Sequence, residues 1–242
     1  AVDGEEFIDD LGRDNGIEAV VLPGETEAEL AFTGASLDVE DDPVVLDIGG
    51  GSTEVMRRLD NGEVRAVSLE IGASRATERW LRSDPPTPRE IANVYQEAQW
   101  AFKRIGFTFS AGGSLVTAAA ETADEAAKRR LVGVAGTVTT LACLDAGLQE
   151  YDAEVLHLRT LTLEGVRGLV EHLGSLTVKE RAALPCMQRG RAPVIVGGAV
   201  ILLAAMETLG YEELTVSERD LLDGLVLRAA SEPSRTGPTV PT

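Results

Sequence analysis

Short apolar runs bounded by glycine, proline and acidic residues alternate along the chain with stretches whose apolar positions recur at helical spacing. The short runs predict strands over residues 17–22, 44–48, 54–59, 64–71, 131–134 and 213–216, with a hairpin turn at 60–62. The longer stretches predict helices over residues 25–33, 73–81, 88–105, 124–130, 137–146 and 221–230, and a mostly helical segment after residue 162. Strands that alternate with helices predict an α/β fold in which helices pack on the faces of a sheet.

The apolar run at 44–48 leads into a group of candidate phosphate ligands: Gly49, Gly50, Gly51, Ser52 and Thr53. Glycines after a strand let the backbone turn sharply and bring its N–H groups close to an anion, and the two hydroxyls add donors. The flanking carboxylates of Asp47 and Glu54 would repel phosphate unless a hard cation such as Mg²⁺ lay between them. The string therefore predicts a metal-assisted phosphate site, with a glycine-rich hairpin carrying solvated acids as the plainer alternative.

A second glycine segment, at residues 133–137, follows an expected strand and opens an expected helix. The N-terminus of a helix exposes unpaired N–H groups and the positive end of the helix dipole, so Gly136 and Thr137 are candidate phosphate ligands. Alone, a Gly-Thr pair at this place is more often a simple helix cap. Together with the first loop, it predicts two anion sites that face one cleft and clamp a pyrophosphate chain.

The string from Asp47 to Glu54 resembles the second phosphate loop of the exopolyphosphatase and guanosine pentaphosphate phosphohydrolase (Ppx/GppA) family. Residues 22–34, 131–142 and 191–202 resemble further motifs of that family, in the same order and spacing. The family belongs to the superfamily of actin, sugar kinases and chaperone ATPases. The resemblance implies a ribonuclease-H-like α/β lobe with helices packed on a mixed sheet. The sequence departs from the family at Pro193, where members often carry Asp.

The resemblance also implies a phosphoanhydride hydrolase that removes the terminal phosphate from inorganic polyphosphate, with Mg²⁺ or Mn²⁺ as its cofactor. Glu27 matches the acid that positions the attacking water in the family, so it is the expected general base. Without the resemblance, Glu27 is one of several acids favoured at the start of a helix. The alternatives are a pppGpp 5′-phosphohydrolase and a non-catalytic module that binds nucleotide or phosphate. We expect a homodimer.

The family's first phosphate loop, Asp-x-Gly-Thr-Asn-Ser-x-Arg, does not occur in this sequence. The chain opens at Ala1 without an initiator Met, so we expect a fragment that lacks most of the first lobe. The alternative is a natural short form that another chain completes. On this interpretation residues 1–40 are a remnant of the first lobe and the crossover segment, residues 41–230 form the second lobe, and residues 231–242 are a disordered tail.

The formal net charge of −18 argues against a nucleic-acid surface, because phosphate backbones require clustered Lys and Arg. It also requires that any polyphosphate site be locally basic or loaded with metal. No apolar run has transmembrane length and no signal pattern is present, so a cytoplasmic protein is expected. Cys143 and Cys186 do not make a disulfide scaffold, and Cys143 is expected to be a small buried side chain. Trp80 and Trp100 are expected in the core.

Overall fold

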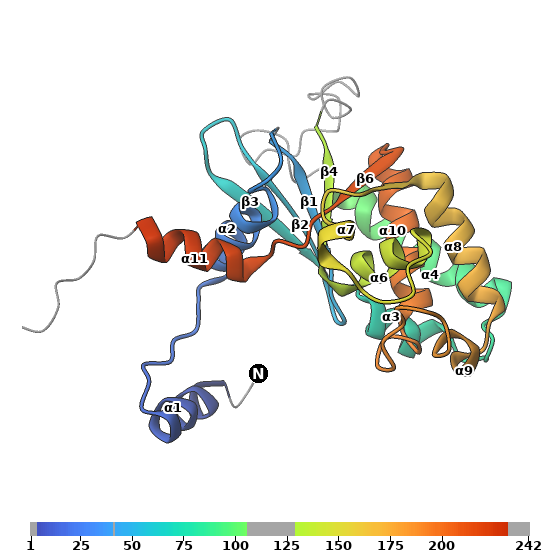
Figure 1. Ribbon diagram of the computed structural model, residues 1–242, viewed down its shortest axis with the longest axis horizontal. Coiled ribbons are helices and arrows are strands. Elements are labelled where there is room, and N and C mark those ends of the chain that lie inside the picture. Colours follow the sequence, from blue (N-terminus) through green and yellow to red (C-terminus); the bar gives the residue numbers. More distant parts are fainter. Residues whose placement is uncertain (1–3, 41, 106–128, 232–242) are drawn as a thin grey trace, which may run out of the picture.

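The computed structural model describes residues 4–40, 42–105 and 129–231 (Figure 1). Its strands are β1 (Val44–Ile48), β2 (Thr53–Arg58), β3 (Val64–Leu69), β4 (Leu131–Val134), β5 (Thr160–Thr162) and β6 (Glu213–Val216). Its helices are α1 (Gly4–Asn15), α2 (Gly24–Ala35), α3 (Ala73–Trp80), α4 (Pro88–Ile105), α6 (Ala135–Asp145), α7 (Ala153–Leu156), α8 (Leu163–Ser175), α9 (Val178–Arg181), α10 (Ile195–Leu209) and α11 (Leu221–Ser231). None of the described helices is both long and apolar enough to cross a membrane.

The described strands form one mixed sheet in the order β3-β2-β1-β4-β6-β5. β1, β4 and β6 run parallel in its centre, where Val45 lies beside Val132 and Gly133 lies beside Val216. β2 and β3 continue the sheet on one side as antiparallel strands, and β5 pairs antiparallel with β6 on the other. The carboxyl ends of the parallel strands meet at one edge, so the segments that follow β1, β4 and β6 lie together there.

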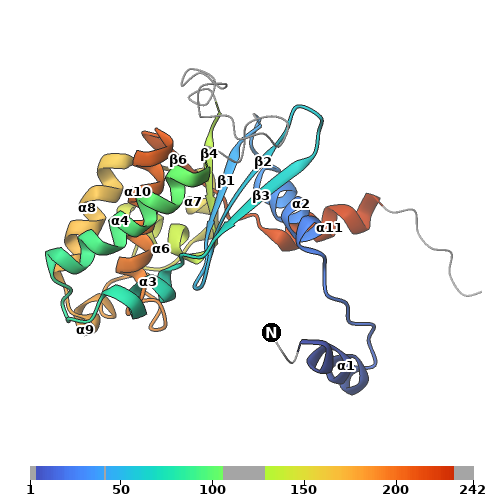
Figure 2. The ribbon, with the colours of Figure 1, turned by 180° about the vertical axis from the view of Figure 1, so that it is seen from behind.

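Helices cover both faces of the sheet (Figures 1 and 2). α3, α4, α6, α8 and α10 lie on one face, around a core that includes Leu46 and Ile48. α10 is buried from Ile195 to Met206, as expected for a helix that is apolar on all sides. On the other face α2 packs on β2 and β3, with Phe32 against Met56, and α11 packs on α2.

α2 and α11 approach so closely that both contact points need glycine. A Cβ atom on Gly34 would lie 1.8 Å from the carbonyl oxygen of Asp220. A Cβ atom on Gly224 would lie 2.0 Å from the carbonyl oxygen of Leu30. Any side chain at either position would push the helices apart. The contact therefore fixes Asp220, just before α11, relative to the helix that carries Glu27.

The fold predicted from the pattern is confirmed, because helices pack on both faces of a mixed sheet. Strands 44–48, 131–134 and 213–216 and helix 88–105 have the predicted bounds. The strand predicted at 17–22 is wrong: Val20 and Val21 are 66% and 71% exposed, and no described strand pairs with them. β5 is too short to give a sequence pattern. Residues 124–128 of the helix predicted at 124–130 lie outside the described part of the chain, and residues 129–130 are not helical. The expected tail beyond Ser231 also lies outside the described part.

Two expectations about single side chains are corrected. Trp100 is not in the core, because it is 63% exposed and the Arg104 guanidinium lies 4.7 Å from the centre of its ring. Trp80 is partly buried and packs against the core, as expected. Cys143 is fully buried as expected, but its sulfur is bonded to Cys186 in a disulfide. The sequence separation of 43 residues hides this pairing from any local pattern.

Candidate active site

Four carboxylates converge on the sheet face that α2 covers. Asp47 of β1 and Glu54 of β2 are direct partners in the antiparallel pairing of these strands, so both side chains point to the same face. Val45, two residues before Asp47, packs in the core beneath α2, which identifies that face. Glu27, from the first turn of α2, and Asp220, just before α11, complete the group.

Burial and neighbouring charge raise the pKa of Asp47 to about 6. Burial contributes most, and the negative charges of Glu54, Asp220 and Glu27 add to it in that order. Glu54 also accepts a hydrogen bond of 2.7 Å from the hydroxyl of Ser68, which orients its carboxylate. Carboxylates that repel one another in a partly buried place form a site that a bound cation would stabilise.

Mg²⁺ or Mn²⁺ fits this set of donors. In phosphoryl-transfer sites Mg²⁺ is commonly bound by one or two carboxylates together with water and the phosphates of the substrate. Asp47 and Glu54 supply such a pair. The described residues contain no group of three or more His, Cys, Asp or Glu side chains that could hold a metal ion by themselves. These two carboxylates would therefore hold the ion only together with water and phosphate.

The first glycine loop is the turn that joins β1 to β2, and the start of α3 supports it. The Gly49 N–H donates to the Ser52 carbonyl at 3.0 Å, which closes the turn. The Gly50 carbonyl accepts a hydrogen bond of 3.0 Å from the N–H of Arg75. Gly50 and Gly51 stay exposed, and the Arg75 guanidinium lies 3.9 Å from where a Cβ of Gly51 would stand. The loop therefore presents backbone, with a guanidinium beside it, to the solvent.

Thr53 and Thr137 use their hydroxyls inside the fold. The Thr53 hydroxyl donates to the Ile71 carbonyl at 2.6 Å. The Thr137 hydroxyl donates to the Ile48 carbonyl at 3.1 Å, and both side chains are buried. This differs from the phosphate-binding hydroxyls expected from the sequence, because buried hydroxyls are satisfied by nearby carbonyls. Ser52 is half-exposed, so it remains the candidate phosphate-binding hydroxyl of the first loop.

The second glycine loop lies beside the first, because β4 pairs with β1 and Thr137 bonds to the end of β1. Ala135 begins α6 with a φ of +63°, a left-handed conformation that side chains rarely adopt. The Arg191 guanidinium packs directly on Gly136, where a Cβ atom would lie 1.6 Å from Nη2. Only glycine at 136 lets the guanidinium reach the start of α6, which is also where backbone N–H groups and the helix dipole favour an anion.

A hollow of about 300 Å³ opens over this second loop. Gly136, Arg191 and Asp220 line it together with Tyr151 and Glu218. The Tyr151 hydroxyl donates to Glu218, and burial followed by this hydrogen bond raises the pKa of Tyr151. Tyr151 therefore stays protonated at neutral pH. Because Asp220 belongs both to the hollow and to the carboxylate group, the two halves of the site adjoin.

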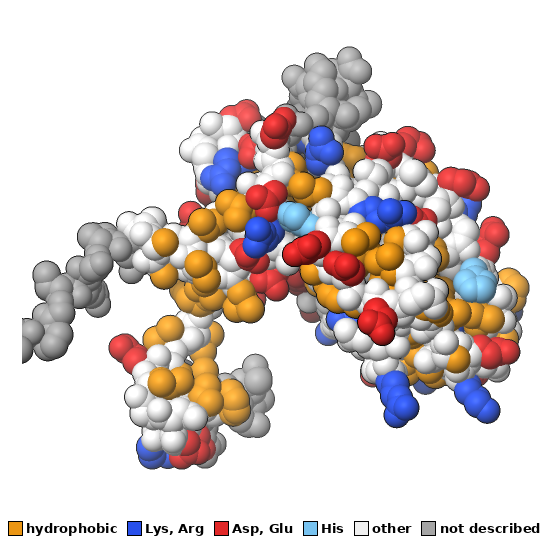
Figure 3. Space-filling view, in the orientation of Figure 1, with side chains coloured by type: hydrophobic (Ala, Val, Ile, Leu, Met, Phe, Trp, Pro, Cys, Tyr) orange, Lys and Arg blue, Asp and Glu red, His pale blue; other side chains and the backbone are white. Residues whose placement is uncertain are grey.

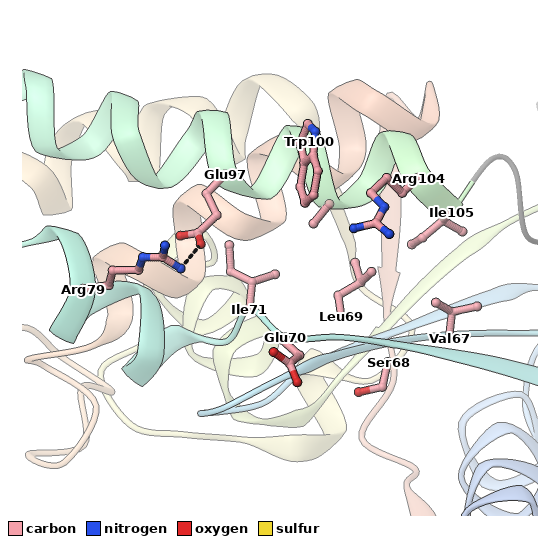
Figure 4. Close-up of a pocket in the computed structure, with 11 residues that line it drawn as sticks. Val67, Ser68, Leu69, Glu70, Ile71, Arg79, Glu97, Trp100, Arg104 and Ile105 are labelled. Carbon is pink, nitrogen blue, oxygen red and sulfur yellow. Dashed lines mark hydrogen bonds and ion pairs between the residues drawn. The ribbon is translucent and has the colours of Figure 1, made fainter.

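A larger hollow, of about 790 Å³, lies between β3 and α4 (Figure 4). Arg79 and Glu97 form an ion pair of 2.6 Å at one side of it, while Trp100 and Arg104 project from α4 toward β3. None of the four convergent carboxylates and neither glycine loop lines this hollow. The arrangement of charge, not the size of the hollow, therefore identifies the candidate active site.

Sequence reasoning misses three residues of this region: Arg75, Arg191 and Asp220. Arg191 begins a segment that matches the family, and that match could have identified it. Arg75 and Asp220 stand near ordinary helix starts in the sequence. Their place in the site is seen only in the folded structure, where Arg75 lies beside Gly51 and the charge of Asp220 acts on Asp47.

Two glycine loops beside a carboxylate group, at the edge where parallel strands end, define a class of α/β proteins that handle phosphoryl groups. The chain belongs to the Ppx/GppA phosphatase family, whose model matches residues 1–232. Exopolyphosphatase 2 of Mycobacterium tuberculosis is 39% identical over 222 residues, which cover 89% of this chain and 65% of that protein. Exopolyphosphatase 1 of Mycobacterium bovis is 31% identical over 238 residues, which cover 94% of this chain and 63% of that protein. The chain thus spans a little under two thirds of the length of these relatives.

Solved structures of related proteins share the fold. An exopolyphosphatase-like protein is 33% identical with a TM-score of 0.74, over 95% of this chain and 73% of that one. The Ppx/GppA phosphatase of Aquifex aeolicus is 26% identical with a TM-score of 0.76, over 94% of this chain and 71% of that one. These similarities confirm the family and the architecture expected from the four sequence motifs.

Proposed function

We propose that the chain carries the metal- and phosphate-binding half of an exopolyphosphatase active site. In the complete enzyme, water attacks the terminal phosphorus of inorganic polyphosphate and orthophosphate leaves. The observation that carries the proposal is the convergence of Glu27, Asp47, Glu54 and Asp220 beside two backbone loops suited to anions. The relatives named exopolyphosphatase support the same substrate class.

Glu27 acts as the general base. It is exposed in the first turn of α2, and its charge acts on Asp47, so it lies within the carboxylate group while still reaching solvent water. A carboxylate placed in this way takes the proton of the water that attacks phosphorus. Asp47 and Glu54 would hold Mg²⁺ or Mn²⁺, which would supply positive charge to the transferring phosphoryl group.

The phosphate chain lies across the two glycine loops. Backbone N–H groups of the first loop and of the start of α6 supply donors that need no rearrangement on binding. Arg75 and Arg191, one beside each loop, supply the local positive charge that a protein of net charge −18 needs to attract a polyanion. Catalysis then rests chiefly on positioning and on stabilisation of charge.

A pppGpp 5′-phosphohydrolase is the runner-up and would use the same phosphate site. The hollow of about 300 Å³ favours it, because Tyr151, Gln188 and Glu218 offer polar contacts to a nucleoside beside the second loop. A non-catalytic phosphate-binding module is the third candidate. It differs from both enzymes in binding phosphate without turnover.

Orthophosphate release from polyphosphate, pppGpp and ATP, measured in parallel with Mg²⁺, tests the proposal. The protein used is an N-terminally extended form of this chain that carries the family's first phosphate loop. We expect the fastest release from polyphosphate. Faster release from pppGpp would favour the runner-up, and tight phosphate binding with no release from any substrate would favour the non-catalytic module.

A further inference from the structure

A disulfide between Cys143 and Cys186 joins α6 to the segment that precedes α10. The two Cα atoms lie 6.2 Å apart, within the usual span of a disulfide. Cys143 is fully buried, whereas Cys186 is half-buried and lines the hollow of about 300 Å³ over the second glycine loop. The bond is therefore part of the wall of the candidate active site.

The same segment carries the cation of the second loop. Arg191 lies five residues after Cys186, and its guanidinium packs on Gly136 at the start of α6. Cys143 lies seven residues after Gly136, two turns further along the same helix and on the same face. The segment is thus fastened to one face of α6 at two points, once by the disulfide and once by the guanidinium.

The segment has other ties, but none of its described backbone hydrogen bonds reaches α6. Met187 and Ala192 are buried in the core, and the Arg191 carbonyl accepts hydrogen bonds from Val194 and from Ile195 at the start of α10. Other backbone hydrogen bonds run within the segment or to the end of α9, such as Met187 to Leu184. Regular helix or strand is absent between α9 and α10. The disulfide is therefore the covalent link between the segment and the helix that begins at the anion site, and it is the tie that reduction removes.

The reduced form is also compatible with the fold. The sulfur of Cys186 lies 3.2 Å from the Leu148 carbonyl oxygen, and that of Cys143 lies 3.9 Å from the Glu150 carbonyl oxygen. After reduction each thiol would have an acceptor within reach, so no buried donor is left without a partner. Both redox states can therefore be populated without unfolding.

We propose that the Cys143–Cys186 disulfide is a redox-sensitive tether that holds Arg191 at the phosphate site. A dithiol reductant attacks Cys186, the accessible sulfur, and forms a mixed disulfide with it, while Cys143 leaves as a thiolate and takes a proton. The second thiol of the reductant then displaces Cys186. The products are two protein thiols and one oxidised dithiol, a two-electron reduction. The freed segment holds Arg191 less firmly over Gly136, and affinity for polyphosphate falls.

The identity of the ligand rests on the proposed function, so the test separates the two. Binding of inorganic tripolyphosphate with Mg²⁺ is measured by calorimetry on the 242-residue chain, oxidised and after reduction with dithiothreitol. We expect Kd to rise about threefold to tenfold on reduction, because a loosened Arg191 loses part of one charge-assisted hydrogen bond, and to recover on reoxidation. Arg191→Ala should bind weakly in both states. Arg189→Ala, an exposed arginine of the same segment, should keep the redox response.

Hydrogen exchange tests the tether without a ligand, and the rate of reduction tests its coupling to the ligand from the opposite side. Hydrogen exchange at residues 184–192 should quicken on reduction, and Cys186→Ser should show the quick exchange in either state. Tripolyphosphate should slow the reduction of the disulfide, because coupling between the two sites is reciprocal. Equal Kd and equal exchange in both states would overturn the tether alone. Absence of tripolyphosphate binding in both states would overturn the proposed function, and with it the regulation of that site.

Discussion

Asp47 and Glu54 stand opposite each other across the pairing of β1 and β2, and the glycine loop at 49–52 is the turn that joins them. A single hairpin therefore supplies both candidate metal ligands and the first phosphate loop. Their mutual distance is set by strand pairing, which is rigid, so the ligands need little reorganisation when a metal phosphate binds. α2 closes over the same face and adds Glu27.

Replacing Glu27 by Gln should lower turnover of polyphosphate by roughly two to four orders of magnitude, because an amide cannot accept the proton of the attacking water. The fold and the affinity for phosphate should be kept, since Glu27 is exposed in the first turn of its helix. Steady-state phosphate release by the N-terminally extended enzyme measures the effect. Glu29→Gln, on the same helix and also exposed, is the matched control and should turn over normally.

Removal of the metal should abolish hydrolysis. Activity should vanish in EDTA and return with Mg²⁺ or Mn²⁺, because the carboxylates of Asp47 and Glu54 cannot face phosphate unshielded. Glu54→Ala should raise the metal concentration for half-maximal activity at least tenfold. Loss of a residue that only supports a metal ligand typically lowers metal affinity about tenfold or more, and Glu54 is a candidate ligand itself. Glu63→Ala, in the exposed turn between β2 and β3, should leave that concentration unchanged. Full activity in excess chelator would contradict the metal assignment.

The hydroxyls of the first loop should separate into a structural and a binding role. Thr53→Val should lower the free energy of unfolding by about 1 kcal/mol, because it removes the bond to the Ile71 carbonyl, while the KM for polyphosphate stays near normal. Ser52→Ala should raise KM without a change in stability, since Ser52 is half-exposed at the loop. Urea unfolding and initial rates distinguish the two variants. The opposite assignment would restore Thr53 as a phosphate ligand.

Much of this site is local in sequence, and that part is predictable. The apolar run at 44–48, the glycines after it and the flanking acids lie within a dozen residues, so strand, turn and carboxylates follow from one short string. What the pattern misses is long-range. The bond from Thr137 to Ile48 joins residues 89 apart, and it decides that the Thr137 hydroxyl faces the fold and not a ligand.

Periodicity also does not distinguish a core position from the rim of a hollow. Trp100 lies on a strongly amphipathic helix, yet it stands beside the buried stripe and not within it. Asp220 gives no sequence signal. It lies near Asp47 only because α2 and α11 pack closely at Gly34 and Gly224. The apolar run at 17–22 looks like a strand, but a strand exists only where a neighbour pairs with it.

The acid dependence of stability should include a contribution from Glu90. Hydrogen bonds from the Thr87 backbone first, and then from the Thr87 hydroxyl and the backbones of Arg82 and Ser83, lower the pKa of Glu90 to about 2. A lowered carboxyl pKa stabilises the fold above the ordinary value of 4.5, and this stabilisation is lost as the pH falls toward 2. Glu90→Gln should therefore lower the urea midpoint at pH 7, with a difference that shrinks at pH 3. Glu78→Gln, exposed on α3, should show no such pH-dependent difference.

The 242-residue chain alone should fold but hydrolyse polyphosphate slowly or not at all. Folding is expected because two buried clusters, one on each face of the sheet, give it a substantial core. Slow hydrolysis is expected because the opposing phosphate loop of the family is absent from the sequence, so the terminal phosphorus is contacted from one side only. Outside these clusters, apolar side chains stay open along α11, with Leu222 and Val226 at 66% and 68% exposure (Figure 3).

Circular dichroism and urea unfolding of the isolated chain measure the first expectation, and phosphate release beside the N-terminally extended form measures the second. Tripolyphosphate binding should survive in the isolated chain, because both glycine loops and Arg191 belong to it. Addition of the extension should then raise turnover by orders of magnitude and tripolyphosphate affinity by less, since alignment of the terminal phosphorus matters more in the transition state than in the bound state. Rapid turnover by the isolated chain would show that its own residues close the site, and an account with two opposing phosphate loops would have to be given up.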